Sequence, residues 1–455
     1  MNSRTNGPVN TSVVRTASKL AKTLAFIFVI FLNFSQFTSL DAQQFTFQEI
    51  EETPLDANVV PVLSNGQIAW SNIVGDDIIR FWDGTTTTTV LDNSSVIPGS
   101  SQNFTSVSSP QLSNGVITFR GIGGNPQQRG IYRYDGSEIS TLVDSNTAAP
   151  GGNSNFFFFR DYDVDGTDLV FSGNTFSGGL GVYRLVDGEA LSLVADTNTL
   201  RPGSTDTFTG FNGVVIDDGA VAFTAGNPNS STQTGVYSQL TTNGELLELI
   251  TENTVIPENG ELFESPGSNL ALDASTLVVQ RFDGSGIYAI PIAGGDPTVV
   301  GDTSTMVPGE NNRTFSSLGG GAIAGDMIAY VGRLPEGVYA RVDGEFVPVI
   351  QRGDVLDGLT AQNFFLSDNG VSEDQIALRI NFGLTPNNIT NKKVYLISVV
   401  RLGDVNLDGL VNVSDISPFI GLLATGRFQL EADIDENGRV DFLDISPFIG
   451  VLSGQ

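Results

Sequence analysis

The middle of this chain of 455 residues repeats itself, and the repeat restricts the folds that are open to the chain. The tripeptide Gly-(Ile/Val)-Tyr recurs at steps of 51, 54, 51 and 51 residues, beginning at Gly130, Gly181, Gly235, Gly286 and Gly337. Degenerate copies begin at Asp77 and Lys393. A Pro-Gly pair keeps nearly the same step, beginning at Pro98, Pro150, Pro202 and Pro308. Two markers in one phase indicate a true internal repeat.

Each repeat has the pattern of about four strands. In the third unit that carries the marker, residues 213–217, 220–225 and 246–250 are rich in apolar and β-branched residues. The pairs Asp218-Gly219 and Asn243-Gly244 favour tight hairpin turns. No part of the repeat region shows sustained helical spacing.

A four-stranded unit of this length, repeated around an axis, is typical of a β-propeller, in which each blade buries its faces against its neighbours. We count seven units, with marker strands near residues 78, 131, 182, 236, 287, 338 and 394. The last unit ends at Val400 without a fourth strand, and we predict that Phe45 to Glu51 completes it and closes the ring. The predicted fold is mainly β, a seven-bladed propeller over residues 43–400. An open β-solenoid or a two-domain β protein is the alternative.

The composition excludes several chemistries. The chain has no cysteine and no histidine, so it has no disulfide, no thiolate site and no Ser-His-Asp triad. A formal charge of −29 argues against nucleic acid as a partner. It suits either a surface that attracts cations or simple solubility. Any catalysis would use carboxylates, Lys, Tyr or a hard cation.

Residues 1–42 have the pattern of a signal peptide. Basic residues precede an apolar run of nine, Leu24 to Leu32, and a polar stretch then ends at Ala42. The run is shorter than the roughly 20 residues of a membrane span. We expect a secreted or cell-surface protein with no membrane span after signal removal. An uncleaved anchor is the alternative.

Few residues of the repeat stand out as candidate ligands. The Asp-Gly pairs at Asp135, Asp187 and Asp343 are interpreted as turns. Asp161 to Gly166 resembles the first half of a calcium loop, but Leu169 and Ser172 would occupy positions 9 and 12, so we interpret it as a turn.

Aromatic residues of the repeat have two interpretations. In Phe156 to Phe159, alternate members would face opposite sides of a strand, which favours packing between blades, and carbohydrate stacking is the second interpretation. The two tryptophans, Trp70 and Trp82, are core residues or a sugar platform, and core is favoured.

The tail carries a pattern that specifies chemistry. A twelve-residue calcium loop places oxygen ligands at positions 1, 3, 5, 9 and 12, a carbonyl at position 7 and Gly at position 6. Gly409 and Gly438 hold position 6 of two such loops, which lie 29 residues apart. The first set of ligands is Asp404, Asn406, Asp408, Leu410 (carbonyl), Asn412 and Asp415; the second is Asp433, Asp435, Asn437, Arg439 (carbonyl), Asp441 and Asp444. We predict two bound Ca²⁺ ions; two acidic surface turns are the alternative.

The same segment, Asp-Ile-Ser-Pro-Phe-Ile-Gly, follows each loop. It predicts two helices, each with one apolar stripe: Ile416, Phe419, Ile420 and Leu423, and Ile445, Phe448, Ile449 and Leu452. Pro418 and Pro447 fall in the first helical turn, where a missing N–H is tolerated. The two stripes can bury each other, and with so small a core the metal is expected to supply much of the folding energy.

Residues 403–453 resemble a type I dockerin: two loops with Asp at position 12, each followed by a helix. The resemblance implies calcium-dependent folding and docking to a cohesin-like protein, often on machinery that degrades polysaccharides. Dockerins often carry Ser-Thr at positions 10 and 11, where this chain has Val413-Ser414 and Phe442-Leu443. The tail is also similar to dockerin-like tails of large secreted proteins from bacteria such as planctomycetes, for which a cell-surface component is an alternative partner. We assign residues 401–455 to this domain.

These features predict a secreted, non-catalytic binding or scaffold protein. The propeller would present a surface for a ligand, with polysaccharide as a candidate, and the tail would be a calcium-dependent tether. One alternative is a carbohydrate-active enzyme, a glycoside hydrolase or lyase, with two carboxylates roughly 5–10 Å apart across the propeller mouth. An axis lined only by apolar and amide groups would favour binding instead. Another alternative is a structural surface protein, and no residue is singled out as catalytic.

Overall fold

The computed structural model describes residues 43–51, 59–72, 77–151, 154–226, 234–258, 260–308, 310, 312–342, 344–384, 390–406, 410–435 and 437–453. It divides into two compact units, of which one is Phe45–Val399 and the other holds Val400–Gln455. The predicted signal peptide, residues 1–42, lies outside the described residues. No helix in the described part of the chain has the length and apolar character needed to cross a membrane.

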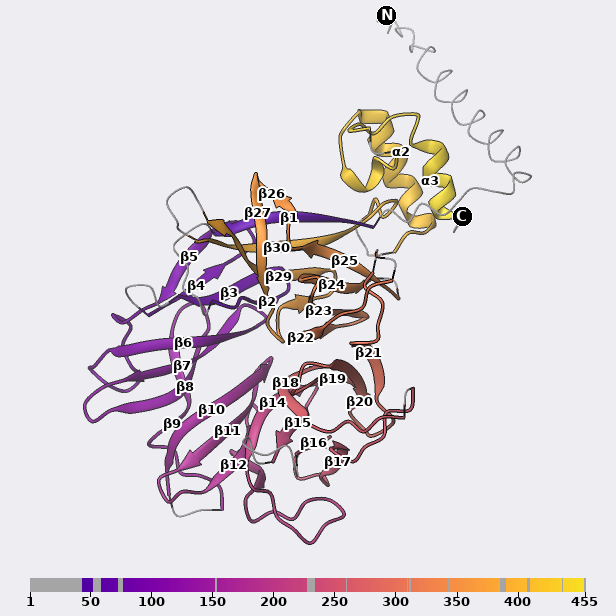
Figure 1. The fold of residues 1–455 in the computed structure, drawn as a ribbon. Helices are drawn as coiled ribbons and strands as arrows, with labels where there is room; N and C mark the ends of the chain where they lie inside the picture. Colours follow the sequence, from indigo (N-terminus) through magenta and orange to yellow (C-terminus); the bar gives the residue numbers. More distant parts are fainter. Residues whose placement is uncertain are drawn as a thin grey trace, which may run out of the picture. The chain divides into compact units, whose positions relative to one another are not determined.

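The first unit is a seven-bladed β-propeller, as the repeat predicts (Figure 1). Six blades are four-stranded sheets whose strands follow chain order, and they are numbered 1 to 6 along the chain. Their strands are β2 (Val62–Ser64), β3 (Gln67–Asn72), β4 (Ile78–Trp82) and β5 (Thr87–Leu91); β6 (Phe104–Ser113), β7 (Val116–Gly123), β8 (Gln128–Tyr134) and β9 (Ile139–Asp144); β10 (Phe156–Asp165), β11 (Asp168–Thr175), β12 (Leu180–Leu185) and β13 (Ser192–Asp196); β14 (Phe211–Asp217), β15 (Ala220–Ala225), β16 (Gly235–Gln239) and β17 (Leu247–Thr251); β18 (Pro266–Asp273), β19 (Thr276–Arg281), β20 (Gly286–Pro291) and β21 (Thr298–Asp302); β22 (Ser317–Ala324), β23 (Met327–Arg333), β24 (Gly337–Val342) and β25 (Glu345–Gln351).

The seventh blade joins the two ends of the repeat region. Its strands are β26 (Val355–Leu356), β27 (Leu359–Phe365), β28 (Val371–Ser372), β29 (Gln375–Leu384), β30 (Thr390–Arg401) and the N-terminal β1 (Gln43–Glu51). The strand β1 lies beside β30, so the predicted closure is confirmed (Figure 1). Glu49 pairs with Lys393 of β30 at 2.7 Å, and Glu51 pairs with Arg80 of blade 1 at 3.0 Å. The strand therefore connects the last blade to the first.

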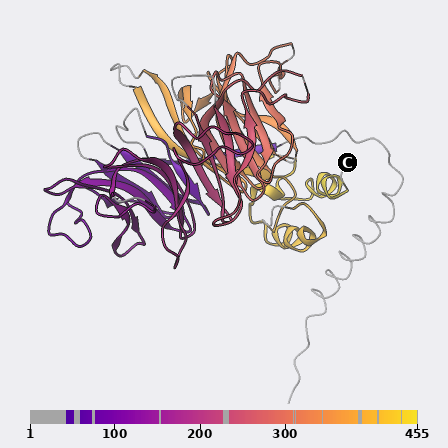
Figure 2. The ribbon, with the colours of Figure 1, turned by 90° about the horizontal axis from the view of Figure 1, so that it is seen from below.

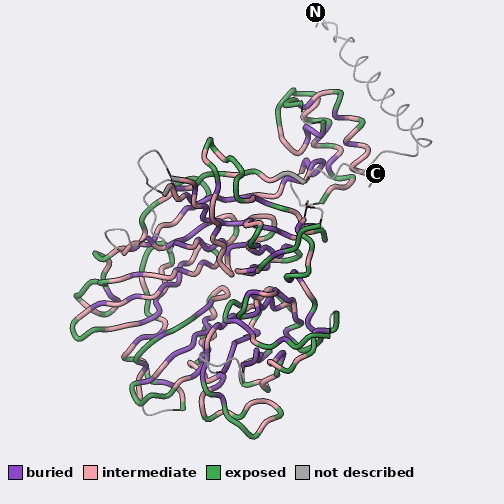
Figure 3. Tube along the Cα trace, in the orientation of Figure 1, coloured by how far each residue is buried: buried purple, intermediate pink, exposed green. Residues whose placement is uncertain are grey.

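Apolar side chains fill every junction between successive blades. Seven buried clusters in the described chain each draw residues from two neighbouring blades, including the pair formed by blades 7 and 1. Figure 2 shows the sheets following one another in chain order, from indigo to orange. Burial follows the strands, whereas exposed residues mark the connections (Figure 3). Trp70 and Trp82 are core residues, as favoured by the sequence.

The Gly-(Ile/Val)-Tyr marker has a packing reason. In blade 2 the buried Tyr132 ring lies 4.9 Å from that of Phe104, edge to face. A Cβ on Gly130 would lie 2.7 Å from the carbonyl oxygen of Val143 on the fourth strand and 2.9 Å from the Tyr132 ring. Gly is thus required where the third strand lies against its own tyrosine and the fourth strand. In each of the other four complete copies, a Cβ on the glycine would lie 2.9 Å or less from the tyrosine or the fourth strand.

A ring of side-chain hydrogen bonds links the turn after the first strand of each blade to the preceding blade. The turn N–H groups of Gly166 and Asp218 donate to Ser113 Oγ and Asp165 Oδ2, each at 2.9 Å. The acceptors at the equivalent positions around the ring are Ser64, Ser113, Asp165, Asp217, Asp273 and Ser372. The seventh position is Ala324, which has no oxygen to accept. The junction of blades 6 and 7 therefore lacks this bond.

The predicted alternation of Phe156 to Phe159 is wrong. Phe156 and Phe159 are buried, but Phe157 and Phe158 are both exposed. The register between β10 and β11 shifts between Phe156 and Phe158, and this β-bulge turns two successive rings to the same side.

The second unit consists of two short helices and the loops before them. Its helices are α2 (Ile416–Thr425) and α3 (Ile445–Leu452), with one-turn 3-10 helices η2 (Val413–Asp415) and η3 (Leu430–Ala432). The rings of Phe419 and Phe448 stack with centroids 3.9 Å apart, so the two predicted stripes meet there. Ile420 is an exception, because it is 41% exposed, and Leu422 packs on the core instead.

Candidate functional site

The second loop of the tail brings three carboxylates together. Single oxygens of Asp433, Asp435 and Asp444 lie within 4.8 Å of one another. Asp433 and Asp444 are buried, and Asp435 is exposed. Gly438 adopts a positive φ of 82°, which provides the sharp turn at position 6.

Backbone N–H groups orient these carboxylates. Gly438 N–H donates to Asp433 Oδ2 at 2.8 Å, and Asp441 N–H donates to Asp444 Oδ2 at 2.8 Å. Asn437 Nδ2 donates to Asp435 Oδ2 at 2.9 Å. The loop therefore wraps around its position 1 and position 12 carboxylates.

The first loop repeats this arrangement where it is described. Asp404 and Asp415 are buried, like their counterparts in the second loop. Asp415 accepts from the N–H groups of Asn406 and Asn412, each at 2.9 Å, and Asn412 Oδ1 caps η2 through Ser414 N–H at 2.8 Å. Asp408 and Gly409 lie outside the described residues. The identity of the two loops at position 12 is thus matched by the hydrogen bonds that Asp415 and Asp444 accept.

The donor set fits a hard divalent cation. Four buried carboxylates in a unit with a single apolar cluster would repel one another and lose hydration, which is unfavourable without a compensating charge. Burial, reinforced by the charges of Asp435 and Asp433, raises the pKa of Asp444. Oxygen-only ligands suit calcium or magnesium, and seven-oxygen loops of this length suit calcium.

The tail also exposes apolar side chains beside the loops. Val413 is 80% exposed, Phe442 71% and Leu443 65%, and these residues hold positions 10 and 11 of the two loops. The structure gives them no place in the tail's own core. These three exposed side chains are hereafter called the loop-tip surface.

A second group of acids lies at the centre of the propeller ring, and the sequence analysis missed its importance. Asp161, Asp163 and Asp165 lie in β10 rather than in a turn, which begins only at Gly166; the turn interpretation of Asp161 to Gly166 is corrected in this respect. Asp161 Oδ2 accepts from Val214 N–H at 3.2 Å, and Asp163 Oδ2 accepts from Ile216 N–H at 3.0 Å. These carboxylates link blade 3 to blade 4.

A loop of blade 7 reaches the same place. Asn369 donates to Asp163 Oδ1 at 2.8 Å and to Gln111 of blade 2 at 2.9 Å, while its carbonyl accepts from Leu63 N–H of blade 1 at 2.8 Å. Asn369 thus joins four blades. The alternation of Asp161, Asp163 and Asp165 along one strand is the sequence signal that could have identified these acids, but only closure of the ring brings Asp368 beside them.

The environment raises the pKa of these acids. Loss of hydration among the neighbouring strands, followed by the charge of Asp368, raises the pKa of Asp161 to about 6, although Asp161 is itself exposed. Burial raises the pKa of Asp163 to about 7, and it also raises that of Asp368. The axis is therefore not lined only by apolar and amide groups.

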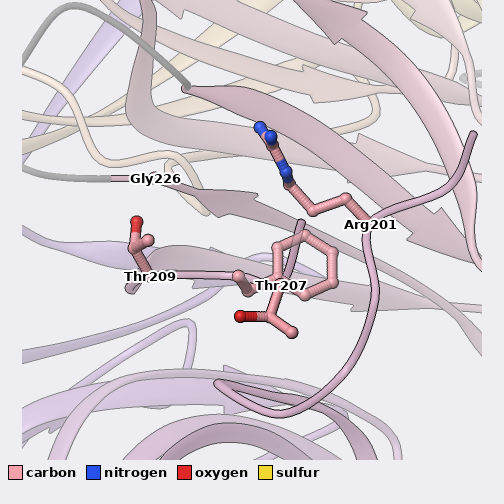
Figure 4. Close-up of a pocket in the computed structure, with 5 residues that line it drawn as sticks. Arg201, Thr207, Thr209 and Gly226 are labelled. Atoms are coloured by element: carbon pink, nitrogen blue, oxygen red, sulfur yellow. The ribbon is translucent and has the colours of Figure 1, made fainter. Parts of the chain in front are cut away.

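A small depression lies on blade 4. Arg201, Thr207, Phe208, Thr209 and Gly226 line a space of about 170 Å³ (Figure 4). This space is open to solvent, and none of it can enclose a water-sized molecule. The depression is not treated as a ligand site.

Comparison with known proteins finds likenesses to solved structures. No family model matches the chain, and no curated protein matches it. A structure from a study of two prolyl endopeptidases aligns with a TM-score of 0.44 and 15% identity over 77% of this chain and 46% of that one. The β-propeller domain of the Trilobed protease from Pyrococcus furiosus aligns with a TM-score of 0.43 and 9% identity, over 74% of this chain and 94% of that domain. The chain spans less than half of the endopeptidase, and at these identities the likeness concerns the fold alone.

Proposed function

We propose that this chain is a secreted, calcium-binding protein whose tail is a calcium-dependent tether and whose propeller is a binding surface. The observation that carries the proposal is the convergence of Asp433, Asp435 and Asp444 in a loop with glycine at its turn. The first loop, with buried Asp404 and Asp415, has the same register. Each loop holds one Ca²⁺, and the ion offsets the mutual repulsion of the carboxylates.

The residues of the tail have separate roles in the proposed binding of calcium. The ligands at positions 1, 3, 5, 9 and 12 supply side-chain oxygens, and the carbonyls of Leu410 and Arg439 supply position 7. Asp415 and Asp444 also begin α2 and α3, so binding at the loop fixes the start of each helix. Calcium binding and the packing of Phe419 on Phe448 are therefore coupled.

The test is a calcium titration of the mature chain by calorimetry. We expect two ions per chain, and Asp444→Ala should leave one, because removal of the position 12 carboxylate disables the second loop alone. Glu431→Gln is the matched control, since it removes one tail charge outside both loops. Zero ions bound at millimolar calcium, or an unchanged stoichiometry in Asp444→Ala, would reject the assignment.

The loop-tip surface is the proposed docking face of the tether. Because it is apolar where type I dockerins carry Ser-Thr, we propose a partner with a complementary apolar face, either a cohesin-like protein or a cell-surface component. Phe442→Ser with Leu443→Thr should abolish calcium-dependent attachment of the protein to the envelope of its own cells while calcium stoichiometry stays at two. Attachment that persists in chelator would contradict the tether.

For the propeller we propose a polysaccharide ligand. An array of glycans, probed with the mature protein at fixed calcium concentration, tests this directly. Binding to one group of polysaccharides supports the role, and the absence of binding to every glycan rejects it.

A second candidate function is carbohydrate cleavage, and one observation favours it. Asp161 and Asp368 are carboxylates of raised pKa at the ring centre, and an acid with a pKa of about 6 can donate a proton near neutral pH. Asp163 is less suited, because both its oxygens accept hydrogen bonds. Release of new sugar ends from polysaccharides, lost in Asp161→Asn and Asp368→Asn, would support an enzyme; no release from any polysaccharide bound on the array would exclude it.

A further inference from the structure

An aromatic surface on blade 3 has no role in the propeller core. Phe157 is 47% exposed, Phe158 38% and Phe176 63%. The rings of Phe157 and Phe176 lie 5.1 Å apart at 57°, so they form one continuous patch. Burial of such rings elsewhere is favourable, and their joint exposure is costly unless a partner covers them.

The backbone holds this patch in place. The β-bulge between Phe156 and Phe158 directs Phe157 and Phe158 to one side, while Phe156 and Phe159 anchor the strand in the core. Phe176 N–H donates to the Asn155 carbonyl at 3.0 Å, which fixes the third ring beside the first two.

Comparison of the blades shows that packing does not require these phenylalanines. In blades 2 to 6 a buried phenylalanine lies at the start of the first strand or shortly before it, and in blade 2 the same bulge follows it. The two residues that follow it are small or polar in the other four blades: Thr105 and Ser106, Thr209 and Gly210, Glu264 and Ser265, Ser316 and Ser317. Only blade 3 of these five has aromatic residues there, so their presence has a reason other than the fold.

Two arginines lie with the patch. The guanidinium of Arg129 lies over the rings of Phe157 and Phe158, at 5.5 and 5.9 Å. Its Nη2 donates to Gln127 Oε1 at 2.9 Å. Arg160 Nε donates to Asn174 Oδ1 at 3.1 Å, and Asn174 lies opposite Phe158 in the pairing of β10 with β11.

No carboxylate neutralises these arginines. Among the described residues neither forms an ion pair, although the chain has 51 acids and only 22 Lys and Arg. Asp161, next to Arg160, accepts from Val214 instead. The patch is therefore a local cationic and aromatic surface on an acidic protein.

We propose that Phe157, Phe158 and Phe176, with Arg129 and Arg160, form a subsite for a polysaccharide that carries spaced acidic sugars. The rings stack on the apolar faces of sugar residues, and the guanidinium groups bind a carboxylate or sulfate group. This subsite rests on the proposed polysaccharide-binding role of the propeller and names its ligand class.

The charge of the chain selects among anionic polymers. Two arginines accept one or two anionic groups, whereas the net charge of −29 over the whole chain repels a polymer that is charged at every unit. Nucleic acid and a polyuronate are of that densely charged kind. A mainly neutral chain with occasional acidic branches fits both the patch and its surroundings.

Three soluble probes separate these possibilities: linear xylo-oligosaccharide, the same oligosaccharide with one glucuronic acid branch, and oligogalacturonate. Calorimetry with the mature protein at fixed calcium is expected to give the tightest binding for the branched probe. Phe157→Thr with Phe158→Ser copies the residues of blade 2 and so preserves the fold, and it should weaken that binding at least about tenfold. Phe282→Ala, which removes a 73% exposed phenylalanine on another blade, is the matched control and should bind like the wild type.

Arg129→Gln should reduce the preference for the branched probe over the linear one while leaving the melting temperature unchanged. Equal binding by the wild type and the Phe157→Thr, Phe158→Ser variant would overturn the subsite, as would tighter binding of oligogalacturonate. Weakening by Phe282→Ala to the same extent would also overturn it. If the glycan array shows no ligand at all, the propeller's proposed role fails; if it shows one that the blade 3 variant still binds, only the subsite fails.

Discussion

The propeller and the tail are both tandem repeats, but they bury different kinds of side chain. The propeller has an apolar cluster at each of its seven blade junctions within the described chain, and the tail has one cluster and four buried loop carboxylates. Apolar burial is favourable in water without any ligand, whereas buried charge is unfavourable until it is compensated. The difference predicts a propeller that folds without a ligand and a tail whose stability depends on a bound cation.

Calcium removal should produce the largest difference between the two units. With excess chelator, we expect the backbone amides of α2 and α3 to lose nearly all protection from hydrogen exchange, because the loop carboxylates then repel one another. Amides of β7 or β15 should exchange as slowly as before. Hydrogen exchange followed by mass spectrometry measures the tail and propeller amides in one sample. Equal protection of the tail with and without chelator would show that the tail does not need calcium to fold.

Loss of the closing strand should be the largest change within the propeller. Deletion of residues 45–51 exposes the edge of β30 and removes Glu51 and Glu49, which form ion pairs with Arg80 and Lys393. We expect the melting temperature to fall by more than about 10 °C. Glu51→Gln alone, as a control, should cost far less, and a deletion variant that melts like the full chain would show that closure does not stabilise the ring.

The ring centre should make propeller stability depend on pH. The pKa of Asp163 is about 7 in the folded chain and 3.8 in a free side chain, so the folded state binds the proton more tightly. Its contribution to the free energy of unfolding is complete below about pH 4 and is lost as pH rises through 7.

Comparison with Asp163→Asn isolates this contribution. Between pH 4 and 8, the stability of the wild type relative to the variant should fall by on the order of 2 kcal/mol. Asp161 and Asp368 titrate in both proteins, so their own contributions largely cancel in the difference. Urea unfolding at a series of pH values measures the difference, and parallel profiles would contradict the shifted pKa.

The smallest expected effect concerns the incomplete ring of turn hydrogen bonds. Ala324→Ser supplies the acceptor that the other six blades have, and we expect a gain of about 0.5–1 kcal/mol. Ser113→Ala removes the bond to Gly166 and should lose a similar amount. Denaturant midpoints report both changes, and a loss of stability in Ala324→Ser would show that the junction of blades 6 and 7 has a different geometry.

The sequence by itself determined the repeat, the number of blades and the strand that closes the ring. The reason is local: the glycine of Gly-(Ile/Val)-Tyr is fixed by a tyrosine two residues away and by the adjacent strand, so each copy carries the same mark. The calcium-loop pattern is likewise local, because all its ligands lie within twelve residues. Its occupancy remains a prediction.

Only the tertiary structure decided what lies between blades. Asp163 and Asn369 are 206 residues apart, and no spacing in the sequence predicts that they meet at the ring centre. The bulge that exposes Phe157 and Phe158 depends on the pairing of β10 with β11, since a period of two along the strand would have buried one of them. Ile420 is exposed because α2 meets α3 at Phe419. In each case a contact with a distant or neighbouring element, rather than the type of the residue, decides where the side chain lies and whether it is buried.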